Sequence, residues 1–169
     1  MDDVACVLAQ FDQRRRLSAK SKIDLLLNVQ DIQDPRVLAL LLRVAADTDE
    51  LSEVRSHVIK TMRTRPIAAD ARIPVARAVG TILLCDASFI VRAQCALTLA
   101  EFTDVAGVAH MLGTVALDGG EPLDVRYSAF ISLERTGPRP ECVEAVQKLS
   151  ADETFGRSAR RLLSMWALL

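Results

Sequence analysis

A Val-Arg pair that recurs three times constrains the fold of this chain more than any other feature. The pairs are Val54-Arg55, Val91-Arg92 and Val125-Arg126. A small or branched residue follows each arginine by three positions, and a large apolar residue follows it by seven: Val58 and Met62, Cys95 and Leu99, Ala129 and Leu133. Offsets of three and seven share one face of a helix. The recurrence therefore predicts equivalent amphipathic helices in a fold built from repeats.

Each Val-Arg helix follows another apolar helix of similar length. These first helices are expected over 35–46, 73–85 and 104–117. Asp34 and Asp104 are expected to cap the helices over 35–46 and 104–117, and Pro74 is expected to open the helix over 73–85. Each pair then forms an antiparallel hairpin that cannot bury both of its faces alone. Stacking of neighbouring hairpins solves this problem.

The predicted fold class is therefore all-α, an α-solenoid of about five antiparallel hairpins in a single domain, 1–169. The central repeats are expected at 34–66, 72–102 and 104–136, where the motif is present. The pairs at 1–33 and 139–169 lack Val-Arg and are expected to cap the two ends, because a terminal repeat has a neighbour on one side only.

The pattern Asp...Val-Arg-x-x-small-x-x-x-large, repeated after an apolar helix, resembles the HEAT-repeat family. More narrowly, it is similar to the short HEAT-like repeats of the phycobilin (PBS) lyase type, with matched motifs over 35–163. The resemblance implies that turn aspartates and helix arginines bond along the stack. The residues that it assigns to this structural ladder are Asp49, Arg55, Asp86, Arg92, Asp118 and Arg126. The alternative is a row of arginines that binds anions.

Net charge argues against broad attraction to nucleic acid, because the 169 residues carry a formal charge of only −1. The strongest basic cluster, Arg14 to Arg16 with Lys20 and Lys22, is expected to be a solvated helix end. Four widely spaced cysteines, at positions 6, 85, 95 and 142, are interpreted as buried apolar residues in a reducing compartment. The N-terminus lacks a signal peptide, and the apolar runs are too short to span a bilayer. A cytoplasmic protein is expected.

Catalytic and metal-binding patterns are not evident in the sequence. Deoxyhypusine hydroxylases are HEAT-like enzymes that hold iron through His-Glu pairs, whereas Val58 follows His57 and Met111 follows His110. No catalytic residue, metal or cofactor is therefore predicted, and the chain is expected not to be an enzyme.

The resemblance also implies that the second helix of each pair lines the concave side of the stack. Outward positions on these helices predict a partner-binding surface with an apolar centre and basic ends: Lys60, Arg63, Leu97, Tyr127, Ile131, Arg157 and Arg161. The expected partner is another protein, with a segment that has an apolar centre and acidic flanks. The alternative is that Leu97 and Ile131 pack between adjacent helices and leave no groove.

A second functional hypothesis follows from the resemblance alone. Phycobilin lyases attach or remove tetrapyrroles, so the chain is alternatively a bilin-handling factor or a lyase subunit. Basic residues on the same surface would then bind the propionates, and Tyr127 with Leu97 would contact the rings. The apolar C-terminal run from 162 to 169 is interpreted as a cap of the last repeat or as a homodimer contact.

Overall fold

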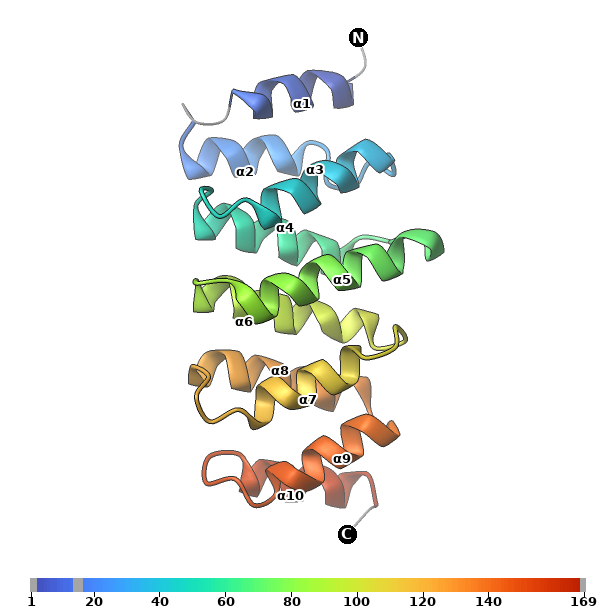
Figure 1. The fold of residues 1–169 in the computed structure, drawn as a ribbon. Coiled ribbons are helices and arrows are strands. Elements are labelled where there is room, and N and C mark those ends of the chain that lie inside the picture. Colours follow the sequence, from blue (N-terminus) through green and yellow to red (C-terminus); the bar gives the residue numbers. More distant parts are fainter. Residues whose placement is uncertain (1–2, 14–16, 168–169) are drawn as a thin grey trace.

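The computed structural model describes residues 3–13 and 17–167, and these residues form an all-α solenoid (Figure 1). No strand is present within these two ranges. The ten α-helices of the described residues follow one another in five stacked pairs, with the two chain ends at opposite ends of the stack. Their bounds are α1 Asp3–Asp12, α2 Ala19–Leu27, α3 Pro35–Ala46, α4 Ser52–Thr64, α5 Ala69–Cys85, α6 Phe89–Leu99, α7 Val108–Leu117, α8 Leu123–Thr136, α9 Pro140–Leu149 and α10 Gly156–Met165, with a short 3-10 helix, η2, at Ala100–Phe102. The predicted fold class is confirmed.

The helices form two layers, because each pair contributes one helix to each side of the stack. The first-helix layer contains α3, α5, α7 and α9, and the second-helix layer contains α4, α6, α8 and α10 (Figure 1). Within the second-helix layer, α6 packs directly against both α4 and α8. Between α5 and α7, in the first-helix layer, contact is much sparser. The second helices α4, α6 and α8 therefore pack as a continuous layer, whereas at the C-terminal end the close contact is between the first helices α7 and α9.

The core lies between the two layers, and the repeat positions occupy it. The residues three positions after the motif arginines are fully buried, and those seven positions after are at most 1% exposed: Val58, Cys95, Ala129, Met62, Leu99 and Leu133. Side chains from the first helices, such as Val44, Leu83 and Leu112, complete the same core. Stability thus comes from burying one stripe of each helix against its neighbours.

Buried hydroxyl groups link consecutive second helices. The Thr98 hydroxyl of α6 donates to the Ile59 carbonyl of α4 at 3.1 Å. The Ser132 hydroxyl of α8 lies 2.9 Å from the Ala96 carbonyl of α6 and 2.8 Å from the Ser128 carbonyl of its own helix. Thr98 and Ser132 occupy the same place in successive repeats, six positions after the arginine. Small hydroxyl side chains here let neighbouring second helices pack closely without leaving a buried polar group unpaired.

Replacing Ser132 with alanine is expected to lower the free energy of unfolding by about 1 kcal/mol, because a fully buried hydrogen bond between α8 and α6 is lost. Urea titration followed by circular dichroism measures this change. Ser164→Ala, an exposed serine on α10, is the control and is expected to leave the midpoint unchanged. Equal midpoints for Ser132→Ala and the wild type would contradict the role of this hydroxyl.

Two helices begin at places other than those predicted. α5 begins at Ala69, so Pro74 lies inside it instead of opening it, and the carbonyl four residues before the proline loses its helical donor. α7 begins at Val108, after Gly107 at a φ of 86°, and not at Asp104. Asp104 is unavailable as a cap because its carboxylate binds Arg72 of α5. Arg72, in the added first part of α5, and Asp104, before α7, thus contact each other where the local signals predicted two helix starts.

Two of the predicted features, the basic cluster and the apolar C-terminal run, lie partly outside the described residues. Arg14 to Arg16 and residues 168–169 lie outside the described residues, so the basic cluster and the end of the proposed homodimer contact are not placed. Trp166, just after α10, packs against the core. Within 3–13 and 17–167, the helices are too short or too polar to cross a bilayer.

Candidate functional site

Three motif arginines join successive repeats at the turns between first and second helices. Nε of Arg55 donates to the Ala45 carbonyl of the preceding helix at 2.9 Å, and its guanidinium pairs with Asp86 of the next repeat. Arg92 likewise binds the Leu83 carbonyl at 2.8 Å and pairs with Glu121. Each guanidinium therefore fastens the end of its own first helix to the following turn.

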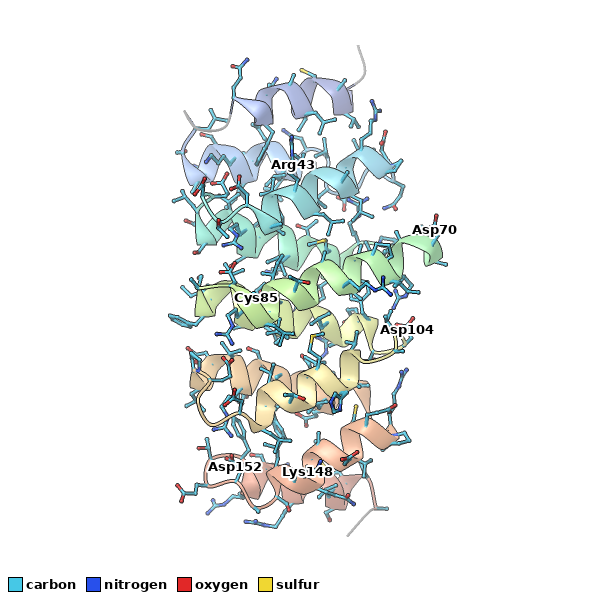
Figure 2. The ribbon with its side chains drawn as sticks, viewed as in Figure 1. Arg43, Asp70, Cys85, Asp104, Lys148 and Asp152 are labelled. Carbon is cyan, nitrogen blue, oxygen red and sulfur yellow. The ribbon has the colours of Figure 1, made fainter. Side chains whose placement is uncertain are left out.

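Arg126 makes the last contact of this kind. Its Nε lies 3.0 Å from the Ala116 carbonyl, and its guanidinium pairs with Asp152. The backbone amide of Phe155 and the Arg126 guanidinium both donate to this carboxylate and hold the pKa of Asp152 below its ordinary value. Asp152 lies in the turn between α9 and α10, on the same side of the stack as the end of α5 that carries Cys85 (Figure 2). Because Nε and Nη2 of these guanidinium groups are occupied, the ladder describes the arginines better than a row of anion sites does.

Lys22 provides the equivalent contact at the N-terminal end. Its Nζ lies 2.8 Å from a carboxylate oxygen of Glu50, and the Lys22 residue is only 6% exposed. The prediction that Lys22 belongs to a solvated basic cluster is therefore wrong. Leu26 and Val29 follow it at offsets of four and seven and are buried, as are the residues at these two offsets in the other repeats, whereas Leu25 at offset three is only half-buried. That spacing was the sequence signal that could have identified Lys22.

Two predicted ladder aspartates do not pair with the arginines. Asp49 is exposed, and its backbone amide binds Oδ1 of Asp47 at 3.1 Å. Oδ1 of Asp118 accepts from the Gly120 amide at 2.8 Å, which closes its own turn. Glu50 and Glu121 supply the carboxylates instead, because the lengths of these turns place those residues beside the neighbouring cation.

An apolar ribbon covers the outward side of α6 and α8 in the second-helix layer. We define the ribbon by five residues: Phe89, Ile90, Leu97, Leu123 and Tyr127. Four of them are among the most exposed large apolar side chains, with exposed fractions of 45%, 54%, 56% and 54% for Phe89, Ile90, Leu123 and Tyr127. Leu97 is half-buried. Exposed apolar side chains that gather on neighbouring helices of a folded domain are typical of a binding site.

Phe89, Ile90 and Leu123 were not predicted as surface residues. They lie two or three positions before the motif arginines, whereas the prediction counted only positions after them. Offsets of minus two and minus three fall on the same helix face as plus one and plus five. Continuing the repeat alignment backwards would have identified all three residues.

Basic residues flank the ribbon on both sides. Lys60 and Arg63 lie on α4, and Arg157 and Arg161 lie on α10; all but the half-buried Arg63 are exposed. A groove of about 310 Å³ between α8 and α10 brings together Tyr127, Ile131, Arg161 and Met165.

Leu97 and Ile131 have different surroundings. Ile131 packs against the buried core, so for this residue the alternative of packing between helices describes its environment better. Leu97 is half-buried on α6, apart from that groove. Ile131 is accordingly left out of the ribbon.

His57 is partly buried on α4, beside the basic flank. Burial, together with the nearby positive charge of Lys60, lowers the pKa of His57 from its ordinary value of 6.5. The folded state disfavours the imidazolium, so the stability contributed by His57 is present above pH 6.5 and is lost as the pH falls through that value towards the lower folded pKa.

The His57→Gln variant is therefore expected to lose less stability than the wild type between about pH 7 and pH 5. Urea midpoints measured across this range test the expectation. Identical pH dependence in the two proteins would contradict it.

The prediction that all four cysteines are buried apolar residues is correct for only two of them. Cys95 and Cys142 are buried, and burial raises the pKa of both thiols. Cys85, the last residue of α5, is exposed, and Cys6 is half-buried. Among the described side chains, no group of three histidine, cysteine or acidic residues is placed to hold a metal ion.

Stacked antiparallel hairpins joined by cation-carboxylate contacts define the chain as an α-solenoid of the helical-repeat class. No protein-family model and no curated protein matches it. Among solved structures, it is similar to human deoxyhypusine hydroxylase in complex with glycerol, at 16% identity and a TM-score of 0.47, over 97% of this chain and 84% of that chain. The narrower resemblance to phycobilin lyases has no support from these comparisons.

The comparison corrects one expectation. The chain was expected not to be an enzyme, yet the similar solved structure is a hydroxylase.

Proposed function

We propose that the chain is an interaction module that binds a segment of a partner protein on its second-helix layer. The observation that carries this proposal is the apolar ribbon, in which Phe89, Ile90, Leu123 and Tyr127 are each about half exposed on adjacent helices. Burial of one such side chain contributes about 1 kcal/mol when half of its surface is removed from water. Five of them supply a hydrophobic centre of useful size.

The fold makes this surface favourable for binding. The ribbon lies on helices that are joined by buried hydroxyl bonds and arginine contacts, so the surface is formed before the partner arrives. A preformed surface reduces the conformational entropy lost on association.

The flanks determine which partner fits. Lys60 and Arg63 on one side, and Arg157 and Arg161 on the other, favour a segment whose apolar centre is bordered by acidic residues. Because these cations lie at the exposed rim, they increase the association rate more than the final affinity. Higher salt is therefore expected to slow association.

Affinity capture from native lysate, followed by mass spectrometry, tests the proposal. The double variant Ile90→Asp/Leu97→Asp is expected to recover a stoichiometric partner at least about tenfold less well than the wild type, because two charges enter the apolar ribbon. Ile73→Asp is the matched control, since Ile73 is 50% exposed on α5 in the other layer. Unchanged recovery with the double variant, at wild-type helical circular dichroism, would contradict the proposal.

A bilin-handling role is the second candidate, and one observation favours it. The groove between α8 and α10 places the Tyr127 ring near Arg161 in a space of about 310 Å³, a combination that suits an apolar molecule with a carboxylate. Visible absorbance of the captured material distinguishes this role from protein binding. A coloured eluate without a stoichiometric protein would support the bilin role and contradict the first proposal.

A further inference from the structure

A groove of about 500 Å³ lies between α5 and α7, in the layer opposite the apolar ribbon. Its lining is mainly small and apolar: Ala69, Ile73, Ala76, Val105, Ala106, Gly107, Val108 and Met111, with Arg72, Arg77 and Asp104 as the polar residues. This volume is in the range of pockets that bind small molecules.

The groove exists because two helices begin where the sequence did not predict. The first turn of α5, before Pro74, extends beyond the neighbouring helices, and its Asp70 end projects from the stack (Figure 2). A loop at 105–107 replaces the expected first turn of α7. Ala69, Arg72 and Ile73, which precede Pro74, and the loop residues 105–107 all line the groove.

Contacts between the two helices limit the groove in length. Towards one end, Nε of Arg72 lies 3.0 Å from Oδ2 of Asp104, and its Nη2 donates to the Glu101 carbonyl at 2.6 Å. Further along α5, Met111 of α7 packs closely on Gly80. A β-carbon added at Gly80 would lie only 2.9 Å from the Met111 methyl group. A helix of another protein running along the groove would meet these contacts, whereas a short molecule entering from the open side would not.

The charges around the groove favour an anion. The Arg72 guanidinium is occupied by Asp104, and this hydrogen bond holds the pKa of the Asp104 carboxyl below its ordinary value. Arg77 is exposed at the rim, and no ion pair joins it to a carboxylate of the described residues. The first turn of α7 also carries no acidic residue. The free Arg77 guanidinium is therefore the group that would bind a negative charge.

We propose that this groove binds a small amphipathic carboxylate. The apolar part of the molecule lies against Ile73, Ala76, Val108 and Met111, and its carboxylate pairs with the guanidinium of Arg77. This site is separate from the proposed partner-binding surface, because it lies on the other layer and shares no residue with the ribbon.

Isothermal titration of the purified protein with decanoate tests the proposal, with decanol as the uncharged probe of similar shape. The wild type is expected to bind decanoate saturably. Arg77→Ala is expected to weaken decanoate binding by about tenfold while decanol binding is unchanged, and Arg77→Lys is expected to restore part of the loss. Ala106→Phe places a ring at the exposed loop wall and is expected to weaken both probes.

The control variant is Lys20→Ala on α2, which removes one exposed positive charge from a helix that does not line the groove and is expected to bind both probes normally. Three results would overturn the proposal: no saturable binding of decanoate, equal binding by Arg77→Ala and the wild type, or undiminished binding by folded Ala106→Phe. A wild-type dimer in sedimentation that Ala106→Phe converts to a monomer would also overturn it, since a second copy would then occupy the groove.

Discussion

Replacement of Arg55 by alanine is expected to lower the free energy of unfolding by about 3–5 kcal/mol. The side chains of Arg55 and Asp86 are only 4% and 5% exposed. Without the guanidinium, the Asp86 carboxylate stays buried with no cation beside it, and the Ala45 carbonyl loses a side-chain donor. Urea or thermal unfolding followed by circular dichroism measures the loss.

A double variant separates the cost of an unpaired charge from the value of the pair. Arg55→Met with Asp86→Asn removes both charges. The asparagine keeps an acceptor for the Ser88 amide, which donates to Oδ1 of Asp86 at 2.9 Å in the wild type. Its stability is expected to lie much closer to that of the wild type. The exposed pair of Lys148 and Glu144 is the control, and Lys148→Ala is expected to change stability by less than about 1 kcal/mol. A comparably small effect of Arg55→Ala would contradict the role of Arg55.

Substitution of Gly113 by leucine is expected to cost about 3 kcal/mol by forcing α7 away from α9. A β-carbon at Gly113 would already lie 2.8 Å from the β-carbon of Ala145, so even alanine needs a shift of the two helices. A larger side chain cannot be accommodated by rotation alone, because the obstruction begins at the first carbon atom.

The neighbouring residue Thr114 provides the control for this prediction. Thr114 is exposed on the same helix, and Thr114→Leu is expected to leave the unfolding midpoint nearly unchanged. A midpoint for Gly113→Leu equal to that of Thr114→Leu would show that the contact between α7 and α9 contributes little to stability.

The fold could be predicted because one pattern repeats. The spacing of Val58, Cys95 and Ala129 after the arginines identifies the buried stripe, and stacking follows from the inability of one hairpin to bury both faces. The helix starts were harder to predict. Local signals at Pro74 and Asp104 pointed to helix starts, whereas in the structure Asp104 pairs with Arg72 of the neighbouring helix, a contact between distant residues that local signals do not specify.

The candidate site could be predicted only in part, for a similar reason. Basic and apolar outward positions after the motif arginine were visible in the alignment, including Tyr127 and Leu97. The choice of Glu121 over Asp118 as the partner of Arg92 depends on the path of a turn, which the spacing of residues along the chain does not specify. Ile131 also shows that a position on the outward side of a helix can still pack against the core.

The arrangement of charges connects the fold to the proposed function. The motif arginines are used inside the stack, where they fix each repeat to the next. On either side of the apolar ribbon, α4 and α10 carry the exposed cations Lys60, Arg157 and Arg161. The repeat contacts thus leave a rigid surface whose centre is apolar and whose borders are basic.

Hydrogen-deuterium exchange of the protein, with and without the partner recovered by affinity capture, tests this account most directly. The account predicts that the partner slows exchange along α6 and α8, with a smaller effect on α4 and α10 and none on α5. Protection concentrated on α5 and α7, or spread evenly over both layers, would contradict the claim that the apolar ribbon of the second-helix layer is the binding surface.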